Sequence, residues 1–292
     1  MKIVIGLPAY NEEKNIATII SNLQKKSYEI IVCDDGSTDN TAYISEKMGA
    51  IVIKHERNKG YGSAIRSLFE KARDSGFDIL VTFDADGQHQ VEEIEKVIKP
   101  ITNYESDIVI GSRFLDGNSS QVPKYRKVGI KMITNLVNSE TGKKISDSQS
   151  GFRAYSKKVF QKIQPSENGM GVSTEILIKS NKEKFRISEV PIKINYEGDT
   201  STHNPVSHGA SVILSTMKFI SIEHPLQFYG IPGIIFLAVG LFFIVWTLQE
   251  FSETRRIITN ISLIGIGSTI LGMIMMMTSI ILYSIVNVVR EK

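Results

Sequence analysis

The sequence predicts an α/β fold with a mostly parallel sheet covered by helices on both faces, followed by a hairpin of two transmembrane helices. Three observations support this prediction. Short apolar runs alternate with helical patterns up to about residue 112, acidic and polar residues follow several of these runs, and two long apolar segments lie between residues 226 and 289. The 292 residues are enough to bury a sizeable core.

The N-terminal part contains near-continuous apolar runs, which are typical of parallel strands buried on both faces. We expect strands at Lys2–Leu7, Glu29–Cys33, Ile51–His55, Ile79–Asp84 and Asp107–Ser112. Between them we expect helices at Glu12–Lys26, Asp39–Met48, Gly60–Ser75 and Val91–Lys99. In such a sheet, ligands bind beyond the carboxyl ends of the strands.

The segment from residue 114 to residue 204 has a mixed pattern. We expect helices at Val128–Asn138 and around Thr174–Ser180, a strand at Arg186–Ile194, and a polar linker at Asp199–Pro205. The stretch Ala210–Ile222 groups apolar residues at helical spacing. This pattern suits a helix in the membrane interface, or one that packs against the main domain.

Two apolar segments, Leu226–Leu248 and Ile261–Val289, are each long enough to cross a membrane, because a helix rises ~1.5 Å per residue and the hydrocarbon core is ~30 Å thick. A buried hairpin in a soluble protein is the alternative, but the second segment carries no charge over its length. We therefore expect an N-terminal α/β domain at 1–205, a linker with an interfacial helix at 206–224, and a transmembrane domain at 225–292.

The composition argues against several classes of protein. A net charge of +3 without a dense Lys/Arg run lacks the footprint of nucleic-acid binding. The only cysteine, Cys33, lies in an apolar run, so no intrachain disulfide can form. The apolar run Ile3–Leu7 is too short for a signal peptide, and we expect the N-terminal domain to stay in the cytoplasm. No Gly-x-Gly-x-x-Gly follows the first strand, which disfavours a dehydrogenase.

Polar residues follow three of the predicted strands, in the segments Pro8–Glu12, Asp34–Ser37 and Asp84–Asp86. Two carboxylates one residue apart at a strand end can hold Mg²⁺ or Mn²⁺, which prefer oxygen ligands. Most Asp-x-Asp triplets are solvated turns, but Gln88 and His89 beside this one, and the hydrophobic strand before it, strengthen the interpretation as a metal site. The segment Asp34–Ser37 has a structural interpretation as well, since Ser37 or the following Thr38 can cap a helix.

Six motifs together resemble glycosyltransferase family 2, and in particular its branch of dolichyl-phosphate mannose and glucose synthases. They stand in the family's order over most of residues 3–200: Pro8-Ala-Tyr-Asn-Glu12, Val32-Cys-Asp-Asp-Gly-Ser37, Asn58-Lys-Gly-Tyr-Gly62, Asp84-Ala-Asp-Gly-Gln88, Gly111-Ser-Arg-Phe114 and Asp147-Ser-Gln-Ser-Gly-Phe-Arg153. The resemblance implies a Rossmann-like GT-A fold, a Mg²⁺ or Mn²⁺ cofactor, a nucleotide-sugar donor, and dolichyl or polyprenyl phosphate as acceptor.

The resemblance also implies roles for single positions. The nucleotide would be held by Pro8, Tyr10, Glu12, Asp35, Ile53, Asp84 and Ala85. The metal would be bound by Asp86 and Gln88, and the acceptor phosphate by Arg113 and Arg126. Ser150 and Gly151 would shape the sugar pocket. The residues expected to carry catalysis are Asp84, Asp86, Arg113 and Arg126.

The chemistry of a lipid phosphate acceptor agrees with these roles. Such a phosphate is already ionised at neutral pH, so a strong general base is unnecessary. A divalent metal neutralises charge on the departing diphosphate, and the planar fork of arginine bonds two phosphate oxygens at once. By analogy with the family, a single displacement would invert the anomeric carbon.

One segment departs from the family pattern. Mannose synthases of this group carry a basic stretch before the membrane region, whereas Thr200–Gly209 contains no Arg or Lys. The departure weakens the prediction of GDP-mannose and favours a UDP-linked hexose or N-acetylhexosamine. His203 could replace the missing donor, or it could be an ordinary loop residue.

Other functions and the topology complete the expectations. A processive polysaccharide synthase is disfavoured, because the only tryptophan, Trp246, lies in an apolar segment and not in a Gln-x-x-Arg-Trp motif. Transfer to a hydroxyl of a glycolipid or polysaccharide stays open, and a catalytically silent scaffold is disfavoured by the intact acidic motif.

We expect a multi-pass membrane protein with both ends in the cytoplasm and Gln249–Asn260 outside, although Arg255 and Arg256 lie in that loop. Its product would serve protein glycosylation, and copies could associate through the transmembrane helices.

Overall fold

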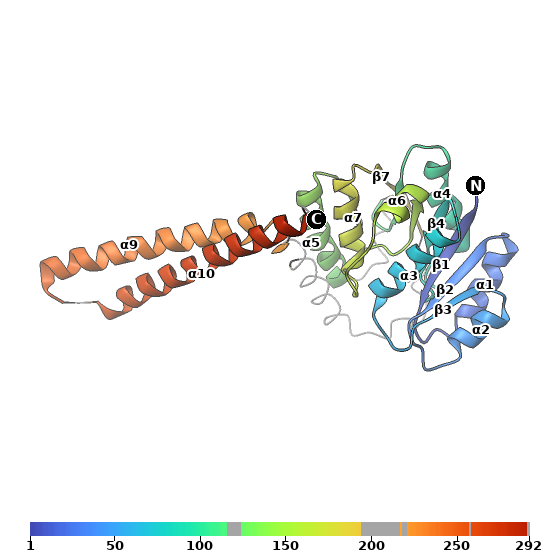
Figure 1. The fold of residues 1–292 in the computed structure, drawn as a ribbon, viewed down its shortest axis with the longest axis horizontal. Coiled ribbons are helices and arrows are strands. Elements are labelled where there is room, and N and C mark those ends of the chain that lie inside the picture. The colour runs from blue at the N-terminus through green and yellow to red at the C-terminus, as the bar shows by residue number, and fades with distance from the viewer. Residues whose placement is uncertain (116–123, 194–216, 218–220, 223, 257, 291–292) are drawn as a thin grey trace. The chain divides into compact units, whose positions relative to one another are not determined.

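The computed structural model describes residues 1–115, 124–193, 217, 221–222, 224–256 and 258–290 (Figure 1). The chain forms two compact units, residues 1–216 and 217–292, which are described one at a time.

The first unit is built around a seven-stranded sheet in the order β3-β2-β1-β4-β6-β5-β7. Its strands are β1 (Ile3–Ala9), β2 (Glu29–Asp34), β3 (Ile51–Lys54), β4 (Ile79–Thr82), β5 (Ile108–Ser112), β6 (Arg153–Ser156) and β7 (Ile187–Pro191). Neighbouring strands are parallel except for β6, which is antiparallel to both β4 and β5. The carboxyl ends of β1, β2 and β4 therefore lie at one edge of the sheet.

Helices cover both faces of this sheet (Figure 1). They are α1 (Ile16–Lys25), α2 (Thr41–Lys47), α3 (Tyr61–Asp74), the 3₁₀ turn η1 (Val91–Glu93), α4 (Ile94–Thr102), α5 (Lys124–Thr141), α6 (Lys157–Lys162) and α7 (Val172–Lys182).

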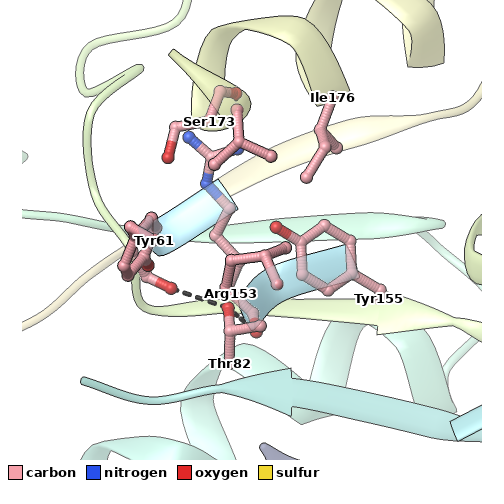
Figure 2. A pocket seen from close by; sticks show the side chains of 9 residues that line it. Tyr61, Thr82, Arg153, Tyr155, Ser173 and Ile176 are labelled. Atoms are coloured by element: carbon pink, nitrogen blue, oxygen red, sulfur yellow. Dashed lines mark hydrogen bonds between the residues drawn. The ribbon is translucent and has the colours of Figure 1, made fainter. Parts of the chain in front are cut away.

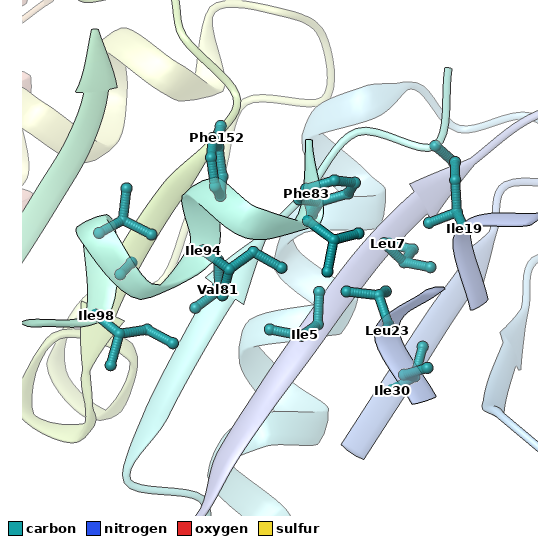
Figure 3. Packing of buried hydrophobic residues seen from close by; sticks show 14 of the residues in the cluster. Ile5, Leu7, Ile19, Leu23, Ile30, Val81, Phe83, Ile94, Ile98 and Phe152 are labelled. Atoms are coloured by element: carbon teal, nitrogen blue, oxygen red, sulfur yellow. The ribbon is translucent and has the colours of Figure 1, made fainter. Parts of the chain in front are cut away.

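Two apolar cores result, because successive side chains of a strand point to opposite faces of the sheet. On one face Ile5 and Leu7 of β1 pack with Leu23 of α1 and Ile94 of α4 (Figure 3). On the other face Val4 belongs to a cluster with buried side chains of α3, α6 and α7. Burying each such side chain contributes about 1.5–3 kcal/mol, so the sheet is a rigid platform for the loops at its edge.

The predicted α/β fold with a mostly parallel sheet is confirmed, and the differences are local. Strand β6 and helix α6 were not predicted, because Arg153–Ser156 is a short segment without an apolar run. Helix α1 begins at Ile16 and not at Glu12, because residues 11–15 form a turn in which Asn11 has a positive φ of 56°.

The second unit consists of a π-helical turn, η3 (Leu226–Gly230), and the long helices α9 (Ile231–Thr254) and α10 (Thr259–Arg290). Two candidate membrane spans, Leu226–Thr254 and Thr259–Val288, have mean hydropathies of 2.4 and 2.1 and only 11% of each is buried. They are long and apolar enough to cross a membrane, in agreement with the two predicted segments.

Glycines allow α9 and α10 to approach each other closely. A Cβ at Gly233 would lie 3.2 Å from the carbonyl oxygen of Gly272, and one at Gly240 would lie 2.9 Å from that of Gly265. Small residues of this kind are what close packing of apolar helices requires.

The region between the two units is mostly not described. The predicted linker Asp199–Pro205 and His203 lie outside the described residues, as does the interfacial helix Ala210–Ile222 apart from residues 217, 221 and 222. The domain boundaries expected at 205 and 224 therefore stay predictions.

Candidate active site

The loop after β1 is tied to the loop after β2 by hydrogen bonds. The backbone N–H of Asn11 donates to Ser37 Oγ at 2.9 Å, and Asn11 Oδ1 accepts the N–H of Thr38 at 2.9 Å. The N–H of Glu12 donates to Thr41 Oγ1 at 2.8 Å. These bonds fix the backbone of the first motif and determine where the side chain of Glu12 lies.

The carboxyl of Glu12 lies in an acidic environment. Burial raises its pKa to about 7; the hydrogen bond from Asn15 Nδ2, at 3.1 Å, opposes this shift, and the charges of Asp86, Asp39 and Asp84 add to it. The structure thus brings Glu12 from the end of β1 together with the two aspartates that follow β4.

Asp84 and Asp86 differ in their surroundings. Burial would raise the pKa of Asp84, but His89, Tyr61 and Arg113 together lower it below its ordinary value. For Asp86, burial and then the charge of Asp84 raise the pKa. The neighbours of Asp84 thus favour its ionised form, whereas burial and the charge of Asp84 disfavour the ionised form of Asp86 more than the N–H of Gln88 and the charge of His89 favour it.

The residues after β4 fit a divalent cation. Asp86 Oδ1 accepts the backbone N–H of Gln88 at 3.0 Å, which fixes the turn that carries both expected ligands. A cation there would favour the ionised forms of Asp86 and Glu12, whose pKa values are raised mainly by burial and further by neighbouring carboxylates. Within the described ranges no group of three or more His, Cys, Asp or Glu side chains is placed to share an ion. Most of the coordination would then come from water and phosphate oxygens, as is common for Mg²⁺.

Asp35, expected to hold the nucleotide, is buried and strongly engaged by the protein itself. Its Oδ1 accepts the N–H of Lys59 at 3.0 Å and lies 2.6 Å from His55 Nδ1, and its Oδ2 accepts the N–H of Gly60 at 2.8 Å. His55 Nε2 lies 2.9 Å from Ser67 Oγ. The carboxylate of Asp35 therefore anchors residues 59 and 60, while its backbone N–H donates to the carbonyl oxygen of Ala9 at the end of β1 at 2.9 Å.

The other residues expected at the nucleotide lie on or next to the sheet. Pro8 is buried in β1, Ala85 is buried after β4, and Tyr10 and Ile53 are half-buried beyond β1 and within β3. They come from the same edge as the acidic residues. The predicted set is thus brought together at the strand ends, and its roles stay predictions.

Arg113, expected to meet the acceptor phosphate, forms a two-pronged ion pair with Asp147. Its Nε and one terminal nitrogen donate to the two carboxylate oxygens at 2.6 and 2.7 Å. The side chain of Asp147 is fully buried and that of Arg113 is 14% exposed. Burial opposes the ionisation of Asp147, but Arg113 outweighs it and holds the pKa low. Arg126 lies in α5, and its side chain is outside the described residues.

The loop expected to shape the sugar pocket reaches Asp84. A Cβ at Gly151 would lie 2.6 Å from both Asp84 Oδ2 and Tyr61 Oη, so only glycine fits there. Ser150 is buried, and its Oγ is among the described buried atoms that have no hydrogen-bond partner. This position suits a loop that contacts the donor.

A small gap lies behind the loop (Figure 2). It is lined by Tyr61, Thr82, Gly151, Arg153 and Tyr155 together with three residues of α7 and Ile65 of α3, and its empty volume is about 170 Å³. Pockets for small molecules usually measure ~300–1,000 Å³. The gap is therefore a packing feature beneath the site and is too small for the donor.

Sequence reasoning noted His89 beside the acidic triplet but gave it no role, and it missed the roles of His55, Tyr61, Asp147 and Arg153. Tyr61, Asp147 and Arg153 lie inside the six family motifs, and that position was the only signal for them. Their partners are distant in the chain, so no local pattern showed what they bind.

A model of the family "Glycosyl transferase family 2" matches residues 4–164, which is more than half of the chain. The match covers the sheet from β1 to β6 and includes the acidic residues after β4.

Characterised and named relatives extend this finding. The chain is 39% identical to UDP-N-acetylglucosamine–dolichyl-phosphate N-acetylglucosaminyltransferase of Methanococcus voltae, over 74% of this chain and 93% of the relative. It is 37% identical to a dolichol-phosphate mannosyltransferase of Pyrococcus furiosus, over 65% of this chain and 56% of the relative. It is 31% identical to a dolichyl-phosphate hexose transferase of Haloferax volcanii, over 78% of this chain and 96% of the relative.

Solved structures share the fold. Glucosyl-3-phosphoglycerate synthase from Mycobacterium tuberculosis, crystallised with Mn²⁺, UDP and phosphoglyceric acid, is 21% identical with a TM-score of 0.57, over 74% of this chain and 78% of that one. The same enzyme with Mg²⁺ and UDP gives a TM-score of 0.56 at 20% identity over the same shares. These similarities establish a GT-A-like architecture.

Proposed function

Since the chain belongs to glycosyl transferase family 2, we propose that it transfers a hexose or N-acetylhexosamine from a nucleotide sugar to dolichyl or polyprenyl phosphate. The chain is a glycosyltransferase, and its named relatives include three that act on dolichyl phosphate. A UDP-linked donor is favoured over GDP-mannose, because the segment 200–209 lacks the basic stretch of the mannose synthases and the relative with 39% identity uses a UDP-linked sugar.

One observation carries the proposal: Asp84 and Asp86 follow β4 at the edge of the sheet where β1 also ends, and the loop at Gly151 packs against Asp84. In the proposed site Asp86 and Gln88 hold Mg²⁺ or Mn²⁺, which would stabilise the departing diphosphate. Asp84, whose pKa is lowered by its neighbours, remains a hydrogen-bond acceptor for hydroxyls of the ribose or the sugar. The remaining nucleotide contacts fall to Pro8, Tyr10, Glu12, Asp35, Ile53 and Ala85.

The acceptor half of the site needs positive charge and no strong base. The phosphate of the lipid is ionised at neutral pH and can attack the anomeric carbon directly, which inverts its configuration. We assign Arg113 and Arg126 to this phosphate and Ser150 and Gly151 to the sugar pocket. Because Arg113 also neutralises Asp147, Arg126 would supply most of the net positive charge.

The hairpin α9–α10 fits a membrane anchor for this reaction. We propose that residues 1–205 face the cytoplasm, where nucleotide sugars are made, with Gln249–Asn260 on the opposite side. Residues 206–224 would connect the domain to the anchor, and copies could associate through the helices.

The function is tested by product identification. The purified full chain is incubated with Mn²⁺, polyprenyl phosphate and a panel of UDP- and GDP-linked sugars, and the lipid product is identified by its mass. We expect one sugar phosphopolyprenol to form with a UDP-linked donor. Equal product from dephosphorylated polyprenol would instead support a hydroxyl acceptor, and no product from any donor would refute the proposal.

A further inference from the structure

The motif Asn58–Gly62 has no role in the proposed function, yet it links two acidic strand ends. The backbone N–H groups of Lys59 and Gly60 donate to Asp35 at the end of β2, at 3.0 and 2.8 Å. Two residues later the N–H of Gly62 donates to the carbonyl oxygen of Asn168 at 2.7 Å. The backbone of Tyr61 is thus fixed on both sides.

Tyr61 points from this anchored backbone to the other strand end. Its hydroxyl donates to Asp84 Oδ1 at 3.1 Å, and His89 Nε2 lies 3.4 Å from Asp84 Oδ2. Burial, followed by the charge of Asp84, raises the pKa of Tyr61 well above its ordinary value, so the phenol remains a donor. The side chain of Asp84 is still 28% exposed, which leaves part of the carboxylate open to a ligand.

Gly151 closes over the bond between Tyr61 and Asp84. A Cβ at this position would meet atoms of both side chains at 2.6 Å, so the backbone of the loop leaves no room for water there. The carbonyl oxygen of Gly151 accepts a hydrogen bond from the hydroxyl of Thr82 at 2.6 Å. The bond is therefore sheltered, and a sheltered hydrogen bond to a carboxylate is stronger than one in water.

Arg153 holds this loop in place from below (Figure 2). It is 1% exposed and donates to the carbonyl oxygens of Ser148, Ser150 and Ser173 at 2.7, 2.8 and 2.9 Å. No carboxylate within the described part of the chain forms an ion pair with it. Burying a cation is costly unless it is hydrogen-bonded, and the three bonds to carbonyl oxygens that Arg153 makes fix the path of residues 148–151.

We propose that Tyr61 is a positioning residue for Asp84, holding the carboxylate in the orientation that the nucleotide-sugar donor meets. The inference rests on the proposed function, in which Asp84 faces the ribose or the sugar. Tyr61 itself does not touch the reacting atoms. A residue that acts through another loses its effect when the other is changed, and this property makes the proposal testable.

The test is a double-mutant cycle of Tyr61→Phe and Asp84→Asn in the full-length protein. Binding of UDP-N-acetylglucosamine with Mn²⁺ is measured by calorimetry without acceptor. In the wild-type background we expect Tyr61→Phe to weaken donor binding roughly tenfold, because one hydrogen bond to a charged group is lost. In the Asp84→Asn background the same substitution should change the affinity less than twofold. Tyr28→Phe is the control, since it removes a hydroxyl from a partly buried tyrosine that packs against the core on the other face of the sheet, and it should change affinity less than twofold.

The outcomes separate the inference from the function on which it rests. Equal effects of Tyr61→Phe in both backgrounds, or an unchanged affinity with a lowered melting temperature, would overturn the positioning role while leaving the function intact. If the wild type does not bind UDP-N-acetylglucosamine, N-acetylglucosamine is excluded as the donor sugar. The same cycle is then measured with the other UDP- and GDP-linked sugars of the product panel. Coupling of the two substitutions in donor affinity supports the inference, equal effects in both backgrounds overturn it, and binding of no sugar refutes the proposed function.

Discussion

Removing one partner of the buried pair of Asp147 and Arg113 should strongly destabilise the catalytic domain, because the other charge is left unpaired. Asp147→Ala removes a carboxylate that is fully buried and leaves the guanidinium of Arg113, which is 14% exposed, without its partner. Breaking a buried pair in this way costs about 3–5 kcal/mol. In a domain of this size each kcal/mol lowers the melting temperature by roughly 2–4 °C, so the expected loss is on the order of 10 °C.

The assay is thermal unfolding of the detergent-solubilised full chain, followed by circular dichroism. Replacing both members, as Arg113→Met with Asp147→Leu, should cost less than Asp147→Ala alone, because no unpaired charge stays buried. If Asp147→Ala costs less than about 1 kcal/mol, or if the double substitution is as destabilising as the sum of the single ones, the reasoning is refuted.

The same pair predicts a pH dependence. The pKa of Asp147 in the folded protein is below its ordinary value of 3.8, so the stabilisation is complete above that value and is lost as the pH falls through the lower, folded pKa. The stability difference between wild type and Asp147→Ala should therefore be constant near neutral pH and shrink below about pH 4. A difference that grew on acidification would contradict the assigned direction.

Three further predictions concern the proposed reaction. Asp86→Ala should abolish transfer that depends on divalent metal while the circular dichroism spectrum stays native, because the residue lies beyond a strand end; near-normal activity at saturating Mn²⁺ would contradict this. Arg126→Ala should remove one charge-assisted hydrogen bond of ~1.5–3 kcal/mol and so reduce the use of polyprenyl phosphate about ten- to hundredfold. Donor binding should stay nearly unchanged, and full activity at limiting lipid would show that Arg126 does not bind the acceptor phosphate. In Glu253→Cys, made without Cys33, the new thiol should be labelled from outside the cytoplasm, and labelling only from the cytoplasm would reverse the proposed topology.

The acidic part of the site could be predicted because its signal is local. Asp84 and Asp86 come directly after a buried apolar strand, and the parallel order of β1, β2 and β4 places their ends at one edge. The two apolar helices were equally visible, since length and hydropathy alone mark them. The motifs then indicated the family, which the comparisons confirmed.

The partners of these residues could not be predicted, because hydrogen bonds formed across the sheet leave no pattern in the sequence. Arg113 was assigned to a phosphate, but the fold places Asp147, 34 residues away, against its guanidinium. Asp35 was assigned to the nucleotide, but its oxygens also anchor residues 59 and 60.

The sequence by itself determined the α/β alternation, the acidic strand ends and the apolar hairpin, since each depends on the hydrophobic pattern of neighbouring residues. Only the tertiary structure decided that β6, a short polar strand, lies antiparallel between β4 and β5. That insertion brings Gly151 and Arg153 beside Asp84 and Tyr61. The physical reason is that strand order depends on the packing of the whole core, which no single segment encodes.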